Sequence, residues 1–151
     1  VSEVIQEITF LIQEIHPAAL KEKGLSAVLR EYAFEWGNRT GIAVDLSLNG
    51  DGRLPLEIEQ ALYRAIQEAL ANVARHSNAR AVRLSLVIQP EEVNISVVDD
   101  GQGFDPSQTP RGMGLRSINE RVERLGGRFT LDSAPGDGTR LIITIPIKDP
   151  A

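Results

Sequence analysis

The sequence lacks cysteine altogether and holds few lysines and histidines. Without cysteine the chain can form neither a disulfide nor a thiolate metal site. Its three lysines are Lys21, Lys23 and Lys148, none of them in a glycine-rich loop, and GxxxxGK[ST] is absent. A P-loop nucleotide site is therefore excluded, and so is a dinucleotide fold, because GxGxxG is missing as well.

Long apolar runs and a surplus of positive charge are also absent. No run approaches the roughly 20 apolar residues that span a bilayer, and no signal peptide is visible. The net charge of −5 argues against nucleic acid as the main partner, because phosphate backbones call for a basic face. The chain begins at Val1 rather than Met, so we expect a piece of a longer protein, with any sensory or membrane part outside it.

The remaining composition is that of an ordinary globular domain, with 42% hydrophobic and 25% charged residues in 151. Apolar spacing predicts helices over residues 2–15, 24–36, 56–76 and 114–125, and strands over 42–48, 81–89, 92–99, 128–133 and 139–147. Pro90 and Glu91 form a tight connection that predicts a hairpin, and residues 101–112 resemble a mobile loop. Helices combined with antiparallel hairpins predict an α+β two-layer sandwich.

The helix expected over 56–76 carries a polar stripe. Glu68, Asn72 and His76 follow one another at intervals of four, so in an α-helix they share one face, with Arg64 and Arg75 near its edges. A carboxylate and an amide oxygen at this spacing suit Mg²⁺, which is usually held by one or two protein oxygens plus substrate phosphates. The alternative is a solvated polar face, and His76 can equally be an N–H donor at the helix end.

Asp99, Gly101 and Gly103 follow a run that alternates like a buried strand. A carboxylate at a strand end can accept a hydrogen bond from an exocyclic amino group such as that of adenine. The two glycines permit positive φ and close backbone approach to a ligand. A plain Asp-Gly turn is the alternative; a calcium loop is not, because its alternating ligands and closing Glu are missing.

A third piece, Gly112–Leu115, opens the helix expected over 114–125. The free N–H groups at a helix N-terminus bind anions, and Arg116 and Arg121 add positive charge nearby. A glycine hinge that merely starts a helix is the alternative. The order and spacing of all three pieces nevertheless predict a nucleotide site.

Together these residues resemble the ATP-binding domain of the GHKL superfamily, which includes histidine kinases and DNA gyrase. Glu68–His76 is similar to its N box, Asp99–Gly103 to its G1 box, Gly112–Leu115 to its G2 box, and Gly136–Thr139 to its final glycine-threonine element. The resemblance covers about residues 18–148.

Two of these motifs resemble more closely those of the histidine kinases that pair with NarL-type response regulators. Residues 67–76 (QEALANVARH) and 112–121 (GMGLRSINER) match that subfamily, and 16–20 (HPAAL) look like the junction from dimerisation helices into the catalytic domain. The resemblance implies a Bergerat fold: a two-layer α/β sandwich with a mixed, mostly antiparallel sheet and helices on one face. It also implies that residues 1–17 end a dimerisation helix and that 18–151 form a cytoplasmic ATP-binding catalytic domain.

Roles for single residues follow from the same resemblance. Asn72 and Glu68 are the catalytic and metal residues: Asn72 would coordinate Mg²⁺, and Glu68 would polarise water or metal near the γ-phosphate. Asp99 would bind the adenine amino group with support from Thr139, and residues 104–113 would form the ATP lid. The implied nucleotide-binding set is Asn72, Arg75, His76, Asp99, Gly101, Gly103, Gly112, Met113, Gly114, Leu115 and Thr139.

The expected activity is transfer of the ATP γ-phosphate to a histidine, for relay to a response regulator. His16 does not fit the acceptor, because it precedes a proline and lacks an adjacent acid. We therefore expect this chain to bind ATP and Mg²⁺ without phosphorylating itself, the acceptor lying in the dimerisation domain of a homodimeric parent that can be membrane-anchored. Two alternatives stay open: a serine kinase of the anti-sigma type on the same fold, and a nucleotide-binding module without turnover.

Overall fold

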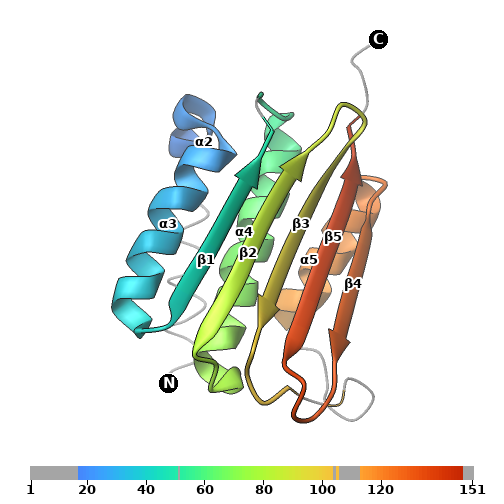
Figure 1. The fold of residues 1–151 in the computed structure, drawn as a ribbon. Coiled ribbons are helices and arrows are strands. Elements are labelled where there is room, and N and C mark those ends of the chain that lie inside the picture. The colour runs from blue at the N-terminus through green and yellow to red at the C-terminus, as the bar shows by residue number, and fades with distance from the viewer. Residues whose placement is uncertain (1–16, 51, 104, 106–112, 148–151) are drawn as a thin grey trace.

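The computed structural model describes residues 17–50, 52–103, 105 and 113–147 (Figure 1). The helix expected over 2–15 lies outside these residues. The elements in chain order are α2 (Pro17–Lys23), α3 (Leu25–Thr40), β1 (Ala43–Asn49), α4 (Leu56–Asn72), the π-helical turn η1 (Val73–Ser77), β2 (Ala81–Ile88), β3 (Glu92–Asp99), α5 (Met113–Arg124), β4 (Arg128–Ser133) and β5 (Thr139–Pro146).

The five strands form one sheet in the order β1-β2-β3-β5-β4. β1 pairs parallel with β2, and every other pairing is antiparallel, which confirms the expected mixed sheet. Strand β3 shows why the register is fixed: Val93, Ile95 and Val97 are buried, while the residues between them are more exposed. A slip by one residue would turn this apolar set away from the core.

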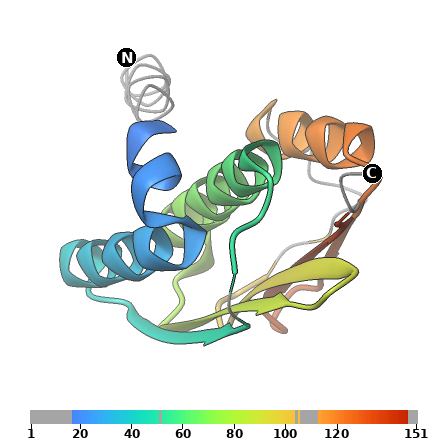
Figure 2. The same cartoon turned by 90° about the horizontal axis from the view of Figure 1, so that it is seen from above.

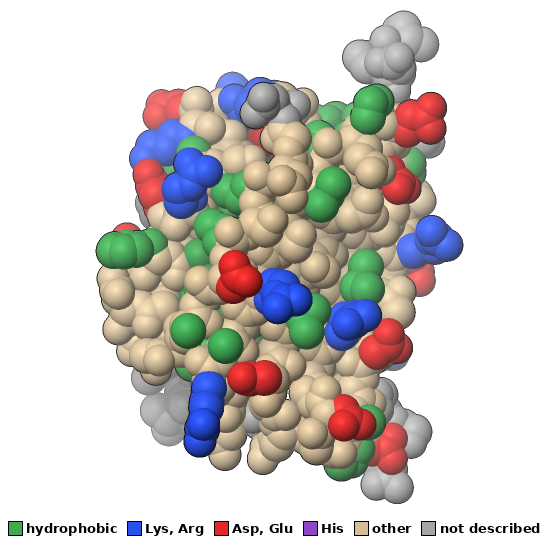
Figure 3. All heavy atoms as spheres, in the orientation of Figure 1, with side chains coloured by type: hydrophobic (Ala, Val, Ile, Leu, Met, Phe, Trp, Pro, Cys, Tyr) green, Lys and Arg blue, Asp and Glu red, His purple; other side chains and the backbone are tan. Residues whose placement is uncertain are grey.

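Helices α3, α4 and α5 lie side by side over one face of the sheet (Figure 2). The expected inner stripe of α4 is confirmed, since Leu62, Ile66 and Leu70 are fully buried between the helices and the sheet. The opposite face of the sheet carries charged side chains of both signs (Figure 3). One solvated face is typical of a mostly antiparallel sheet. Within the described ranges, no helix has the length and apolar character that crossing a membrane requires.

Three helical features differ from the expectations. The short helix α2 begins at Pro17, where the chain was expected to leave a helix, because proline is tolerated in the first turn. α3 continues beyond Trp36 to Thr40 and ends at Gly41, whose φ of 77° forms a left-handed cap. The last turn of the helix expected over 56–76 is π-helical, from Val73 to Ser77.

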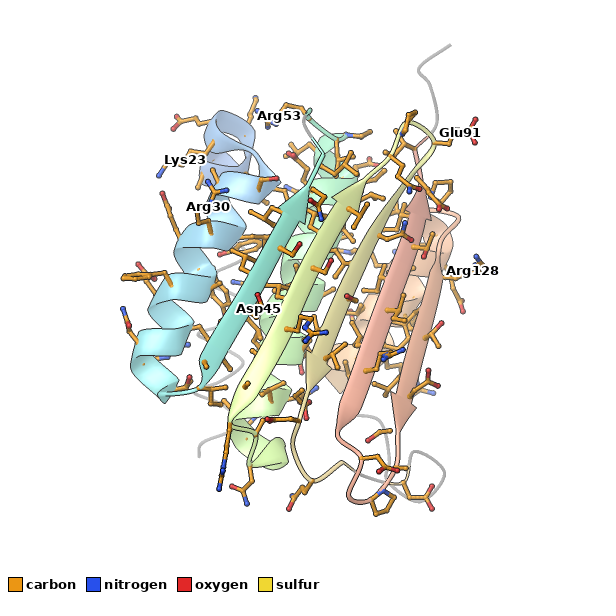
Figure 4. All side chains as sticks on the ribbon, viewed as in Figure 1. Lys23, Arg30, Asp45, Arg53, Glu91 and Arg128 are labelled. Carbon is orange, nitrogen blue, oxygen red and sulfur yellow. The ribbon has the colours of Figure 1, made fainter. Side chains whose placement is uncertain are left out.

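An ion pair with a buried carboxylate joins the start of α4 to α2 and α3. Glu59 is 1% exposed, and its Oε2 accepts a hydrogen bond from the backbone N–H of Leu25 at 3.2 Å. Its Oε1 lies 3.2 Å from Nη2 of Arg53, which also donates to the carbonyl oxygens of Leu20 at 2.8 Å and Lys21 at 3.1 Å. Figure 4 shows Arg53 beside α2. The pair therefore fixes the α2–α3 junction against α4.

Arg53→Ala should lower the free energy of unfolding by about 2–3 kcal/mol, because the buried Glu59 carboxylate loses its countercharge. The loss stays below that for a fully buried pair, since the Arg53 side chain is 51% exposed. Asp45→Asn is the matched control, because it breaks an exposed ion pair. The side chains of Asp45 and Arg83 are both 73% exposed, so losing this pair should lower the free energy of unfolding by less than about 1 kcal/mol. Urea denaturation measures both, and equal effects would contradict the role of Glu59.

Candidate functional site

The expected site residues come from element ends that meet at one edge of the molecule. The C-termini of β3 and α4 and the N-termini of β5 and α5 all lie at the lower edge in Figure 1. Asp99 ends β3 directly opposite Thr139, which begins β5. Asn72 ends α4, and Met113 begins α5. The fold thus brings together three segments that are far apart in the sequence.

Asp99 takes the last core-facing position of β3, two residues beyond Val97, and is 7% exposed. Its Oδ1 accepts a hydrogen bond from the N–H of Gly101 at 2.8 Å. Burial raises the pKa of the Asp99 carboxyl. Hydrogen bonds from the backbone N–H groups of Gly101 and Thr139 lower this pKa and so offset part of the effect of burial. An ionised carboxylate has about four acceptor sites, so two N–H donors leave room for another donor such as an amino group.

The neighbouring Asp100 points the other way and has a different task. Its Oδ1 accepts hydrogen bonds from the backbone N–H groups of Arg80 at 2.9 Å and Ala81 at 3.1 Å. These two donors lower the pKa of Asp100. Asp100 therefore secures the start of β2, and only Asp99 is placed to meet a ligand at this edge.

Two glycines at this edge, Gly103 and Gly138, face the chain's own backbone. Gly103 has a φ of 66°, and a Cβ there would collide with the carbonyl oxygen of Ala134 in the β4–β5 turn. Gly138 has a φ of 73°, and a Cβ on it would collide with the carbonyl oxygen of Asp99. Gly103 and Gly138 thus lie where two loops interlock, which fixes the backbone around Asp99, and the approach of Gly101 and Gly103 to a ligand stays a prediction.

The end of α4 gathers three of the expected polar side chains. Nη2 of Arg75 lies 3.3 Å from Oδ1 of Asn72 and 3.7 Å from Oε1 of Glu68. Nε of Arg75 donates to the carbonyl oxygen of Ala71 at 3.3 Å. The Glu68 side chain is 17% exposed and that of Arg75 is 37% exposed, so the cluster faces solvent only in part.

The π-helical turn η1 changes the geometry expected for His76. The shared stripe of Glu68, Asn72 and His76 assumed α geometry throughout, whereas the backbone widens to π-helix at Val73. Single π turns occur often at functional sites. The side chain of His76 lies outside the described residues, so its role stays a prediction.

The start of α5 is described only in part. Met113 and Gly114 form its first two residues, as expected for a helix N-terminus, but the side chain of Met113 is not described. Gly112 and most of the expected lid, 104–113, lie outside the described residues. Leu115 is buried in the hydrophobic core, and its part in nucleotide binding stays a prediction.

The donor chemistry at the end of α4 fits a hard divalent cation. In the part of the chain that the structure describes, no three His, Cys, Asp or Glu side chains gather into a possible metal centre. Glu68 and Asn72 offer instead a carboxylate and a carboxamide oxygen. Such a pair is suited to Mg²⁺ whose remaining ligands are phosphate and water.

One contributor to this edge was not anticipated from the sequence patterns. The hydroxyl of Ser133 lies 3.0 Å from Oγ1 of Thr139 and donates to the carbonyl oxygen of Gly138 at 2.9 Å. Ser133 and Thr139 are direct partners in the β4–β5 hairpin. Pairing the expected strands 128–133 and 139–147 across their turn was the signal that could have found it.

Comparisons with known proteins agree with this geometry. The family model "Histidine kinase-, DNA gyrase B-, and HSP90-like ATPase" matches residues 57–149. Similar curated proteins include the signal transduction histidine-protein kinase/phosphatase DegS of Brevibacillus brevis, 36% identical over 97% of this chain. The oxygen sensor histidine kinase NreB of Staphylococcus carnosus is 33% identical over 98% of the chain, and the sensor histidine kinase LiaS of Bacillus subtilis 33% over 96%. The chain spans 39%, 44% and 40% of the lengths of these relatives.

Solved structures support the fold. The blue-light activated histidine kinase of Erythrobacter litoralis aligns with a TM-score of 0.75 at 20% identity, covering 97% of this chain and 56% of that one. The mycobacterial sensor histidine kinase MprB aligns with a TM-score of 0.61 at 22% identity, covering 82% of this chain and 94% of that one. At these identities the likeness shows a shared fold.

Gly103→Ala should lower the free energy of unfolding by about 3 kcal/mol, because left-handed strain adds to a collision with backbone. Gly136→Ala is the matched control in the partner turn. Gly136 has a φ of 88° but open space around a Cβ, so only conformational strain of about 1 kcal/mol is expected. Thermal and urea denaturation compare the two; equal losses would contradict the interlock.

Asp99→Asn and Asp100→Asn should change stability in opposite directions at pH 7. The folded pKa of Asp99 is raised, so its ionisation destabilises the fold as pH rises from about 4 through that raised pKa. Removing the charge should therefore stabilise the protein at pH 7, with a gain that vanishes toward pH 4. The folded pKa of Asp100 is lowered, so its variant should be less stable at pH 7, with a loss that shrinks on acidification. Urea denaturation across pH tests both signs, and two shifts of the same sign would refute the assignment.

Proposed function

The chain belongs to the family of histidine kinase-, DNA gyrase B- and HSP90-like ATPases, and on that premise we propose that it is the ATP-binding catalytic domain of a sensor histidine kinase. The observation that carries the proposal is the carboxylate of Asp99, buried at a strand end with acceptor capacity to spare. In the last turns of α4, whose end lies at the same edge (Figure 1), Glu68 and Asn72 offer oxygens suited to Mg²⁺. An amino acceptor and a metal-phosphate site together describe an adenine nucleotide.

Different residues of the chain bind different parts of the nucleotide. Asp99 accepts a hydrogen bond from the adenine amino group, and Thr139, held by Ser133, supports that end of the base. The backbone N–H groups at the start of α5 face the phosphates, as free donors at a helix N-terminus do. Mg²⁺, when bound, neutralises phosphate charge, which is most of what phosphoryl transfer requires. Asn72 holds the metal, and Glu68 orients the groups near the γ-phosphate.

The phosphate acceptor is proposed to be a histidine in a dimerisation domain outside this chain. The curated relatives are named as histidine kinases, and the chain spans less than half of each. Residues 1–17 would then end a dimerisation helix, and 18–151 would form the catalytic domain on the cytoplasmic side of a homodimeric parent. A NarL-type response regulator is the proposed recipient, on the strength of the motifs at 67–76 and 112–121.

The two alternatives have less support. An anti-sigma-type serine kinase shares the fold, but the relatives that match nearly the whole chain carry histidine kinase names. A module without turnover would not need the oxygens of Glu68 and Asn72 at one helix end, where a single guanidinium contacts both.

Isothermal titration calorimetry of the chain with ADP and Mg²⁺ tests this proposal. Wild-type protein should bind, and Asp99→Asn should weaken binding roughly 10- to 100-fold, because the adenine amino group loses its acceptor. Asp45→Asn on the open face of the sheet serves as the control with the same chemical change and should bind like wild type (Figure 4). If the wild-type protein binds no adenine nucleotide, or Asp99→Asn binds equally well, the proposed function is wrong.

A further inference from the structure

The guanidinium of Arg75 contacts both Asn72 and Glu68, the two side chains proposed to bind the metal. Nη2 of Arg75 is 3.3 Å from Oδ1 of Asn72 and 3.7 Å from Oε1 of Glu68. A single cation thus faces the carboxamide oxygen and the carboxylate at the end of α4 together. These are the two oxygens whose chemistry best fits Mg²⁺ among the side chains gathered there.

Two cations that share these oxygens repel each other. Mg²⁺ binds its ligands directly, at about 2.0–2.1 Å, so a metal ion on Asn72 and Glu68 would lie close to the Arg75 guanidinium. Positive charges about 4 Å apart repel by roughly 1 kcal/mol in water and about 4 kcal/mol near a protein surface, per unit charge product. We propose that Arg75 is a built-in counter-cation that competes with Mg²⁺ for Asn72 and Glu68 and so sets the magnesium dependence of nucleotide binding.

The structure favours an Arg75 that can leave. Its contacts to Asn72 and Glu68 are long, and its side chain is 37% exposed. It extends from the π-helical turn, where the regular α-helical hydrogen bonding has ended. The ion pair at the other end of α4 shows the contrast: the Glu59 side chain is 2% exposed, and Arg53 bonds to a backbone carbonyl at 2.8 Å, whereas the backbone bond of Arg75 to Ala71 is 3.3 Å long. The pair at the end of α4 is thus held by the longer contacts.

A second consequence concerns binding without the metal. The Glu68 carboxylate would repel nucleotide phosphates if it stood alone, and Arg75 reduces that repulsion. Removing the guanidinium charge should therefore weaken nucleotide binding in the absence of Mg²⁺. It should also ease metal entry when Mg²⁺ is present. Both effects enlarge the ratio of the dissociation constant in EDTA to that in Mg²⁺.

The inference rests on the proposed function and is tested by measuring ADP binding to the whole chain by calorimetry, in EDTA and across a Mg²⁺ titration. Arg75→Gln should raise the EDTA-to-Mg²⁺ ratio of dissociation constants at least about fivefold and lower the Mg²⁺ concentration for half-maximal binding. Arg75→Lys keeps the charge and should retain a ratio closer to wild type. Arg80→Gln, which removes one exposed positive charge outside α4 and the π-helical turn, should leave the ratio unchanged.

The possible outcomes distinguish a failure of the role proposed for Arg75 from a failure of the proposed function. A purely structural role for Arg75 would weaken binding equally with and without Mg²⁺, and a phosphate contact would weaken it without lowering the Mg²⁺ concentration for half-maximal binding. An unchanged ratio or an unlowered Mg²⁺ midpoint in Arg75→Gln would overturn the proposal. A ratio raised as much by Arg75→Lys or Arg80→Gln as by Arg75→Gln would overturn it too. Wild-type protein that binds no ADP under either condition would refute the proposed function itself, a result distinct from binding with an unaltered ratio.

Discussion

The period-two alternation of β3 is the constraint on which the site depends. Val93, Ile95 and Val97 face the helices, and the same register gives the next inward position to Asp99. A carboxylate there cannot turn to solvent without moving the apolar residues before it out of the core. The loops around it follow from this placement: backbone N–H groups reach the carboxylate, and glycine is required where the two loops cross at Gly103.

Helix α4 joins this edge to the rest of the molecule and carries an ion pair at each end. At its start, Glu59 and Arg53 hold the α2–α3 junction by bonds to backbone as well as to each other. At its end, the Glu68 carboxylate is more exposed than that of Glu59, and the pair with Arg75 is longer, at 3.7 Å against 3.2 Å. The buried Glu59 carboxylate and the 2.8 Å backbone bond of Arg53 make the first pair structural, whereas the longer contacts of Arg75 are the ones proposed to exchange. A rigid helix can thus present a replaceable cation beside the phosphates proposed for this site.

The sequence patterns predicted the parts of the structure that depend on periodicity. Apolar spacing located the inner stripe of α4 and the strands to within about a residue, and alternation identified Asp99 as a buried strand end. The features that the sequence patterns did not predict depend on backbone and side-chain geometry, which residue spacing does not encode. A π turn begins where the residue pattern still reads as helix, and the neighbour that requires glycine at Gly103 comes from a turn thirty residues later. The pairing of Arg75 with Asn72 and Glu68 likewise depends on side-chain conformation.

The central claim is that the buried Asp99 carboxylate recognises the exocyclic amino group of adenine. Comparing the binding of ADP and inosine diphosphate to the wild-type chain, both with saturating Mg²⁺, tests it most directly, because inosine carries a carbonyl where adenine carries that amino group. An acceptor facing that position should leave inosine diphosphate at least about 10-fold weaker, since two acceptors would oppose each other. Equal affinities for the two nucleotides would contradict the account.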